Sequence, residues 1–364
     1  MKTKLGLNKA QKSTHQSLTK PFGKKFISLV LCVCMLTAML SAMPISVFAA
    51  SSGTCGDNLT WTLDNNGTLT ISGTGVMRTY DNDYGVPWYR IRNNIKKVII
   101  QNGVTSISSY AFYYCSCLTS VTIPNSVIDI GDETFYNCSS LSSVNIPNRV
   151  TSIGAYTFAN CGDLTGIRIP NSVTSIGNSA FASCLRLSSV NIPNRVTSIG
   201  GSAFSGCVRL TSISIPYSVI SIGRYAFNDC YNMTSINVDD DNQYYSSLHG
   251  NLYNKNRTEL IQYAIAKNDT YFLIPNGVTS IGWRAFSSCK TLISVSIPEG
   301  VTSIGWGAFY GCSNLANISI PSGVTSISGS TFNECSSLRS VSIPNSITSI
   351  DNWAFYKCDS LTNI

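Results

Sequence analysis

Cysteine, histidine and serine are the residues whose types and spacing decide which chemistry this sequence can support. Twelve of the fourteen cysteines follow residue 49, but His249 is the only histidine in that part of the chain. One histidine cannot supply the ligand sets of most zinc sites or the base of a hydrolytic triad. No serine has a histidine or lysine base at a defined spacing. We therefore predict no catalytic residue, no metal site and no cofactor, and hence a protein that is not an enzyme.

Ten of the cysteines recur at one position of a repeat and predict a ladder of buried thiols. Each follows a phenylalanine by three residues, and neighbouring phenylalanines are 23 residues apart in two series, Phe112 to Phe227 and Phe286 to Phe355. Side chains that point the same way one coil apart are poorly aimed for a disulfide. We expect them to fill small voids in the core. Cys55 and Cys117 are out of phase, and Cys117 is predicted to be exposed. The ten are Cys115, Cys138, Cys161, Cys184, Cys207, Cys230, Cys289, Cys312, Cys335 and Cys358.

Aromatic residues close to each phenylalanine form the second set with a possible function. Trp283 and Trp306 are 23 residues apart, so they are predicted to stack on neighbouring coils as a row. Exposed aromatic rows exceed what a soluble monomer needs, and they favour ligand binding. The alternative is that the rings pack over the coil edges. The candidate ligand-binding residues are Trp283, Trp306, Trp353, Tyr110, Tyr156 and Tyr225.

The elements that must position these residues follow from one repeat unit. In it, Leu118, Val121 and Ile123 predict a short strand whose alternation sends Val and Ile inward. Pro124 lacks an N–H and ends the ladder there, and Val127 and Ile130 supply a second extended segment. Gly131 and its equivalents suit a turn with positive φ. A single coil cannot bury its apolar face alone, so the coils must stack.

The phase of the repeat therefore predicts a mainly β solenoid of 23-residue coils with short helical or 3₁₀ corners. Strand positions Ile236 and Phe272 are 36 residues apart, so the coil at about 236–272 carries 13 extra residues and lacks the Ala-Phe-x-x-Cys corner. Its segment 250–263 predicts a hairpin that turns around 255–257. The solenoid is expected to span 95–364, with an incomplete last repeat.

The residues before the first coil show other patterns. Residues 50–94 contain alternating strands and an Asn66-Gly67 turn, which predict a β-hairpin cap over the first apolar layer. Residues 1–49 combine lysines, an apolar run of 18 residues and Val47-x-Ala49, as in a secretory signal peptide. A retained anchor is the alternative, because that run just reaches spanning length. Pro44 and the small residues favour cleavage after Ala49.

The net charge of +7 comes from this leader, which has seven lysines and no acidic residue. Residues 50–364 carry 18 basic and 18 acidic residues. A neutral body with few charges lacks the electrostatic footprint of a nucleic-acid partner. We predict no nucleic-acid binding, no membrane insertion after signal cleavage, and a secreted protein, free or associated with the cell surface.

The unit Ala-Phe-x-x-Cys-x-x-Leu-x-x-Val-x-Ile-Pro, with Val-Thr-Ser-Ile-Gly, resembles the BspA-type leucine-rich repeat family over about residues 95–364. The resemblance implies a curved leucine-rich-repeat solenoid, secreted or displayed on bacterial or protist surfaces. It also implies adhesion to host matrix proteins or to other cells, and it brings no catalytic residues.

We therefore expect an extracellular repeat protein that binds a protein or glycan ligand through an extended face. Adhesion is the function that the family resemblance suggests. The aromatic rows suggest the alternative of a carbohydrate-binding or scaffold module. A further alternative is the targeting region of a longer secreted enzyme.

Overall fold

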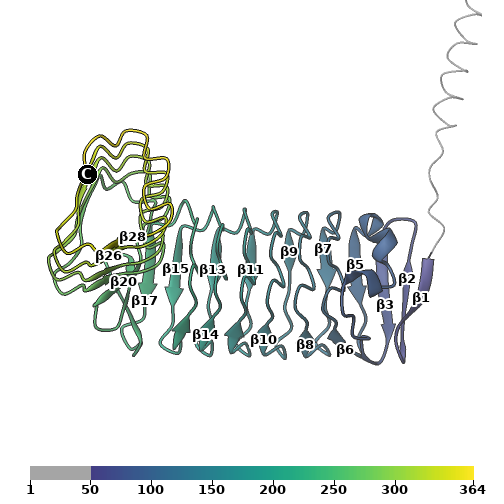
Figure 1. Ribbon diagram of the computed structural model, residues 1–364. Helices are drawn as coiled ribbons and strands as arrows, with labels where there is room; N and C mark the ends of the chain where they lie inside the picture. Colours follow the sequence, from purple (N-terminus) through teal and green to yellow (C-terminus); the bar gives the residue numbers. More distant parts are fainter. Residues whose placement is uncertain (1–50) are drawn as a thin grey trace, which may run out of the picture. The chain divides into compact units, whose positions relative to one another are not determined.

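The computed structural model describes residues 51–364, most of which form stacked β-coils of 23 residues (Figure 1). The predicted signal peptide lies outside the described residues. Within 51–364, no helix is long and apolar enough to cross a membrane. The two described helices are short 3₁₀ helices before the first coil, and the corners of the coils, where helical or 3₁₀ turns were expected, are runs of turns instead.

The first elements extend the sheet of the solenoid. Strands β1 to β3 are antiparallel, and β3 then pairs in parallel with the first coil, with Leu69 opposite Val98. Trp88 is buried beneath this region, and its Nε1 donates a hydrogen bond of 2.6 Å to the carbonyl of Ala111. The elements are β1 (Ser51–Gly56), β2 (Leu59–Leu63), β3 (Thr68–Gly73), β4 (Gly75–Val76), η1 (Asp83–Gly85) and η2 (Tyr89–Asn94).

Each regular coil supplies a strand to each of two parallel ladders, and the register advances by one repeat. Ser152 of one coil lies opposite Ser175 of the next, and Ser175 opposite Ser198. The first stack contains β5 (Lys97–Ile100), β6 (Val104–Ile107), β7 (Ser120–Thr122), β8 (Asp129–Ile130), β9 (Ser143–Val144), β10 (Ser152–Ile153), β11 (Gly166–Arg168), β12 (Ser175–Ile176), β13 (Ser189–Asn191), β14 (Ser198–Ile199), β15 (Ser212–Ile215) and β16 (Ser221–Ile222).

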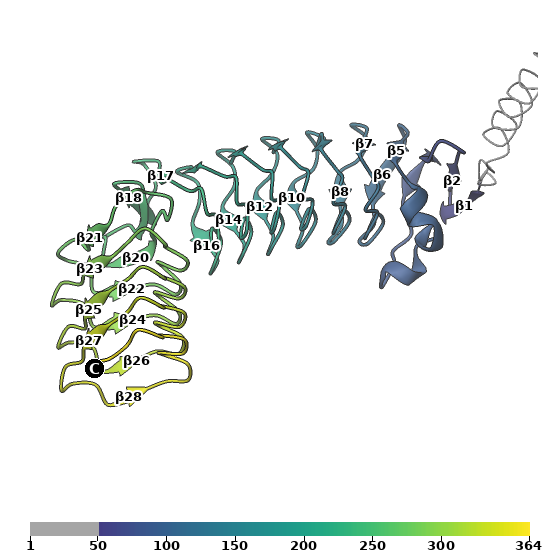
Figure 2. The same cartoon turned by 90° about the horizontal axis from the view of Figure 1, so that it is seen from above.

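The enlarged coil lies between the two regular stacks (Figure 2). The hairpin predicted around 255–257 is present as β19 and β20, and a second hairpin, β18 with β19, precedes it. The elements are β17 (Ser235–Val238), β18 (Tyr245–Leu248), β19 (Asn251–Asn254) and β20 (Glu259–Gln262), followed by β21 (Tyr271–Leu273), β22 (Ser280–Ile281), β23 (Ser294–Ser296), β24 (Ser303–Ile304), β25 (Asn317–Ser319), β26 (Ser326–Ile327), β27 (Ser340–Ser342) and β28 (Ser349–Ile350).

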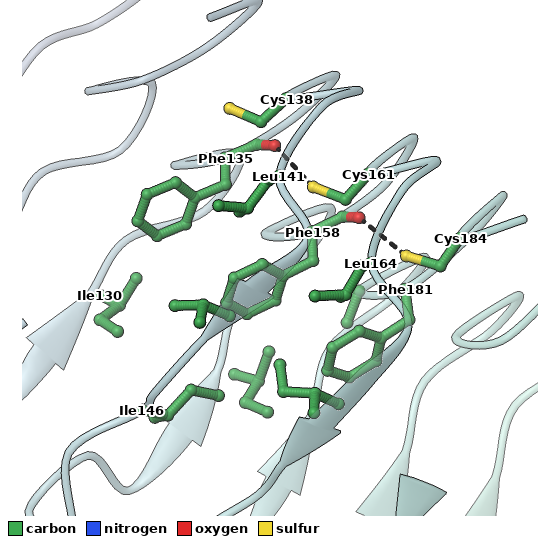
Figure 3. Close-up of a cluster of buried hydrophobic side chains, with 14 of the residues drawn as sticks. Ile130, Phe135, Cys138, Leu141, Ile146, Phe158, Cys161, Leu164, Phe181 and Cys184 are labelled. Carbon is green, nitrogen blue, oxygen red and sulfur yellow. Dashed lines mark hydrogen bonds between the residues drawn. The ribbon is translucent and has the colours of Figure 1, made fainter. Parts of the chain in front are cut away.

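The core consists of two columns of phenylalanine rings, Phe112 to Phe227 and Phe286 to Phe355, flanked by aliphatic side chains and thiols; Figure 3 shows part of the first. Phe135 and Phe158 have ring centroids 5.4 Å apart and are completely buried. The predicted thiol ladder is confirmed: the ten cysteines are free, nine of them are buried, and Cys161 Sγ donates to the carbonyl of Phe135 at 3.2 Å. Burial raises the pKa of the Cys115 thiol to about 12. Cys117 is exposed, as expected.

The prediction of positive φ at Gly131 and its equivalents was wrong. None of these glycines has a positive φ. They are required for close approach instead: a Cβ on Gly131 would lie 2.4 Å from the Ser109 nitrogen, and one on Gly223 would lie 2.3 Å from the Gly201 nitrogen. Glycine therefore permits the coils to stack at this edge.

Candidate binding surface

The corners of the coils present side chains from backbone in the left-handed region. The residue two positions before each phenylalanine has a φ between 52° and 63°, and so does a residue two positions after most of them. Tyr110, Tyr156, Tyr225 and Trp353 occupy the first of these positions, and so does Arg284. Non-glycine residues adopt this conformation at an energetic cost that the surrounding structure must offset. The repeat thus fixes where these side chains leave the coil.

The enlarged coil has no corner of its own. The corners before and after it, 59 residues apart in sequence, therefore lie next to each other. Ser288 Oγ donates a hydrogen bond of 3.2 Å to Asp229 Oδ1, which spans that distance directly. Tyr263 takes the place of the missing phenylalanine below, with its ring 5.1 Å from the ring of Phe286. We call the surface above it, formed by Arg224, Tyr225, Trp283, Arg284 and Trp306, the junction cluster.

Guanidinium groups and aromatic rings alternate in the junction cluster. Arg224 Cζ lies 3.9 Å from the centroid of the Trp283 ring, which is 6.4 Å from the ring of Tyr225. Arg284 Cζ lies 5.0 Å from the Trp306 ring and 5.8 Å from the Tyr225 ring, and it is also 4.7 Å from the ring of Tyr310. These distances are typical of cation–π contacts.

The predicted row of Trp283 and Trp306 is therefore interrupted. No direct ring contact joins these two indoles among the aromatic pairs of residues 51–364, because guanidinium groups cover both rings. Trp306 lies against Gly329 of the next coil, where an added Cβ would be 3.1 Å from the indole Nε1. Trp283 is 44% exposed. The two indoles belong to one surface but do not form a stacked ledge.

Three cavities adjoin the junction cluster. One of about 340 Å³ is lined by Arg224, Tyr225 and Trp283 together with residues of the enlarged coil. A second of about 360 Å³ lies between Tyr225, Arg284 and Trp306, with Asn228 and Asp229 beside them. A third of about 530 Å³ extends from Arg284 and Asp229 toward the later coils. The missing corner therefore leaves the surface hollowed.

Two polar groups beside these cavities, the Arg284 guanidinium and Asn228 Oδ1, have no hydrogen-bond partner within residues 51–364. Arg284 makes no side-chain hydrogen bond or ion pair within residues 51–364. Asn228 is 4% exposed, and its Oδ1 has no hydrogen-bond partner. Its Nδ2 donates at 2.7 Å to Asp229 Oδ2, so Asp229 is committed to protein contacts. Unpaired buried polar groups cost free energy unless something binds them.

Tyr110 and Tyr156 belong to a different group, which we call the cap-side cluster: Tyr110, Tyr113, Tyr114, Tyr136 and Tyr156. Tyr113 and Tyr136 stack with centroids 4.9 Å apart, and Tyr156 contacts Tyr136 at 6.3 Å. Burial, with a contribution from Glu133, raises the pKa of Tyr113 to about 12. These rings contact one another from coil to coil rather than enclosing a space.

Trp353 lies alone in the last complete corner. It is 67% exposed and contacts no other ring among the aromatic pairs of residues 51–364. The six candidate residues are thus divided: Tyr225, Trp283 and Trp306 come together, Tyr110 and Tyr156 form part of a second surface, and Trp353 is separate.

Sequence reasoning missed Arg224, Arg284, Asn228 and Asp229 as members of the site. Arg284 holds the repeat position that Tyr110 and Tyr225 hold elsewhere, beside Trp283. The loss of one corner, already visible in the 36-residue step, could have indicated that residues 59 positions apart would meet. Nothing in the sequence showed that the two arginines would cover the indoles.

Comparisons with known proteins agree with this architecture. The model of the BspA type leucine rich repeat region matches overlapping segments from residue 89 to residue 364, namely 89–207, 151–249, 177–268 and 262–364. No curated protein matches the chain.

Solved structures give the same result. A leucine rich cell surface protein from Faecalibacterium prausnitzii A2-165 is 32% identical, with a TM-score of 0.69 over 86% of this chain and 94% of its own. A leucine-rich repeat protein from Eubacterium ventriosum is 29% identical, with a TM-score of 0.61 over 86% and 84%. The pneumococcal vaccine antigen PcpA, 19% identical with a TM-score of 0.61 over 86% and 88%, shares the fold.

Proposed function

Because the chain belongs to the BspA-type leucine-rich repeat family, a family of repeat proteins of the bacterial surface type, we propose that it is an extracellular binding protein that recognises a macromolecular ligand at the junction cluster. In this proposal the leader directs secretion, and the protein acts free or associated with the cell surface. Its partner is an extracellular protein or glycan of a host or of another cell.

The observation that carries the proposal is the hollowed junction itself. Trp283 is 44% exposed, Arg284 has no hydrogen-bond acceptor within residues 51–364, and the two groups border adjoining cavities. Tryptophan and arginine are the residue types most often found at binding hot spots. A regular solenoid corner does not require such a combination, since the cap-side rings satisfy one another.

Adhesion is the form of binding that we propose. The Faecalibacterium relative is described as a cell surface protein, and a binding face presented there meets matrix proteins and other cells. The stacked coils give an extended, rigid scaffold, which limits the conformational cost of binding.

The test is solid-phase binding of residues 51–364 to laminin, collagen and fibronectin and to whole epithelial cells. Trp283→Ala is the variant and Trp353→Ala the matched control, because both change an exposed tryptophan of a corner. We expect Trp283→Ala to weaken binding by about 1–2 kcal/mol, roughly 5- to 30-fold, and Trp353→Ala to leave it unchanged. Equal binding by both variants would exclude the junction cluster as the binding surface.

A further inference from the structure

The chemistry of the ligand can be read from the groups that the junction leaves unpaired. Arg284 is half-buried among Tyr225, Trp306 and Tyr310, and its guanidinium has no carboxylate or carbonyl partner in residues 51–364. Arginine presents a planar set of donors that fits a carboxylate with two parallel hydrogen bonds. The surrounding rings shield the guanidinium from water, which strengthens such a pair.

Asp229 does not take the role of this carboxylate. Its Oδ2 accepts from Asn228 Nδ2 at 2.7 Å, and its Oδ1 accepts from Ser288 Oγ at 3.2 Å and from the Tyr231 hydroxyl at 3.4 Å. Glu334, at the edge of the adjoining cavity, pairs with Lys357 at 3.1 Å. Apart from water, an acceptor for Arg284 therefore comes from a bound molecule and not from these two carboxylates.

Hydroxyl groups line the same cavity. Ser202 and Ser205 belong to its lining, and each hydroxyl group can donate a hydrogen bond to a ligand or accept one from it. Asn228 also lines the cavity, but its unpaired Oδ1 is fully buried and is not offered to a ligand.

Flat apolar faces complete the cavity. Trp306 is held against Gly329, and Tyr225 borders the same space. Aromatic rings pack readily against the C–H face of a sugar, which is apolar on one side and polar at its edge. A volume of about 360 Å³ is at the lower end of the range for small-ligand sites, about 300–1,000 Å³. It suits a terminal sugar residue rather than a long segment of a chain.

We propose that this cavity binds a carboxylate-bearing sugar, a uronic or sialic acid residue of an extracellular glycan. The carboxylate pairs with Arg284, the ring hydroxyls form hydrogen bonds with Ser202 and Ser205, and the sugar ring packs on Trp306 and Tyr225. This inference rests on the proposed function and names the class of ligand. An acidic peptide supplies a carboxylate but neither the hydroxyl donors nor the saturated ring that the other groups favour.

The experiment compares probes that differ in charge alone. Saturation-transfer NMR and calorimetry measure binding of tetragalacturonate, 3′-sialyllactose and the methyl esters of both to residues 51–364. We expect at least one acidic probe to bind ten-fold or more tightly than its neutral counterpart. Binding of an acidic hexapeptide with no preference for the sugars would overturn the inference, as would equal binding of acidic and neutral probes.

Three variants locate the effect. Arg284→Gln removes the charge and is expected to abolish the preference for the acidic probe, whereas Arg284→Lys retains a smaller preference. Arg209→Gln changes an exposed arginine of a regular coil and serves as the control. Melting curves establish that each variant is folded. An unchanged preference in folded Arg284→Gln would refute the inference. If matrix-protein binding still depends on Trp283 while no acidic sugar binds, the proposed function stands and this inference fails.

Discussion

The cap-side cluster and the junction cluster come from the same corner of the repeat, yet they differ in what their side chains contact. In the cap-side cluster, Tyr113 and Tyr136 come from consecutive coils and stack at 4.9 Å. In the junction cluster, Trp283 and Trp306 also come from consecutive coils, but the rings meet guanidinium groups instead. The same corner of the repeat therefore gives a closed surface in one region and an open, hollowed surface in the other.

The difference follows from the missing corner. Where consecutive coils each supply a tyrosine after the phenylalanine, as at Tyr113 and Tyr136, the rings lie about 5 Å apart along the stack, and contact between them buries their faces. Where one corner is absent, residues of coils 59 positions apart must meet, and their spacing no longer matches. Arginine side chains are long enough to span the gap, but they leave cavities and unpaired groups. An irregularity in a regular scaffold is thus where a binding site can form.

The largest effect is expected beneath the two clusters, at the ring that begins each of the two phenylalanine columns. Trp88 stacks on Phe112 at 5.7 Å and Tyr263 lies 5.1 Å from Phe286, and both are buried. Trp88→Ala and Tyr263→Ala should each lower the free energy of unfolding by about 3–5 kcal/mol, as for other buried aromatic truncations. Urea denaturation measures this change.

The exposed Trp353 provides the control for that prediction. Trp353→Ala should change the free energy of unfolding by no more than about 0.5 kcal/mol, since surface substitutions rarely do more. A loss below about 1 kcal/mol in Trp88→Ala would show that the column does not depend on its end ring.

The thiol ladder should give the next largest effect, a dependence of the free energy of unfolding on pH. Burial raises the pKa of Cys115 to about 12, above the ordinary value of 9.0. The protonated thiol is thus favoured by the folded state. Stability should be fully present below pH 9 and should fall as pH rises from 9 toward 12, by about 1.4 kcal/mol per pH unit for each such thiol. Urea denaturation at pH 8 and pH 10.5 tests this, and Cys115→Ala should reduce the slope.

Cys289 is the exception that the junction creates. The coil before it has no phenylalanine corner, so its Sγ lies 3.6 Å from Thr291 Oγ1 instead of donating to a phenylalanine carbonyl as Cys161 does at 3.2 Å. We expect alkylation of the native protein to modify exposed Cys117 first and Cys289 before Cys161, as measured by peptide mass spectrometry. Modification of Cys161 before Cys289 would contradict the comparison.

Two substitutions with smaller effects should distinguish a residue that stabilises the fold from one that binds the ligand. Tyr136 contacts three tyrosines of the cap-side cluster, and aromatic pairs contribute about 0.5–1.5 kcal/mol beyond their buried area. Tyr136→Ala should therefore lower the free energy of unfolding by about 1–2 kcal/mol and leave ligand binding unchanged. Trp283→Ala should do the reverse. Calorimetric melting and solid-phase binding on both variants decide whether the two clusters differ in role.

The sequence was sufficient to predict the coil, the core and the thiol ladder because each depends on residues that recur in every repeat. Phe158, Cys161 and Leu164 are buried in the same way as their equivalents one coil away. The enlarged coil and its hairpin were also predictable, since they appear as a break in the spacing. The division of the chain into a cap at 50–94 and a solenoid at 95–364 stays a prediction.

The junction cluster could not be predicted because it depends on contacts that do not recur. Arg284 and Tyr225 hold equivalent positions in the repeat, so the repeat gives no reason for them to meet. The role of Gly131 was missed for a related reason: its requirement comes from the backbone of the preceding coil, 2.4 Å from an added Cβ, rather than from its own φ. The repeat pattern predicts the conformation and the buried residues of one coil, whereas these features depend on contacts between coils.

The smallest expected effects come from substitutions at the corner position with left-handed backbone. The change in the free energy of unfolding should have opposite signs in a regular coil and beside the junction cluster. Ser179 lies in a regular coil with a φ of 53°, and Gly307 occupies the same position beside the junction cluster with a φ of 61°. Ser179→Gly should raise the free energy of unfolding by about 0.5–1 kcal/mol, because glycine adopts this conformation without the strain of a Cβ. Gly307→Ser should lower it by a similar amount. Its Cβ would also lie 3.3 Å from Arg284 Cγ and would displace that side chain, so binding of the acidic sugar should weaken as well. Urea denaturation and calorimetry on the two variants check both effects, and an unchanged affinity in Gly307→Ser would show that the position of Arg284 does not control the site.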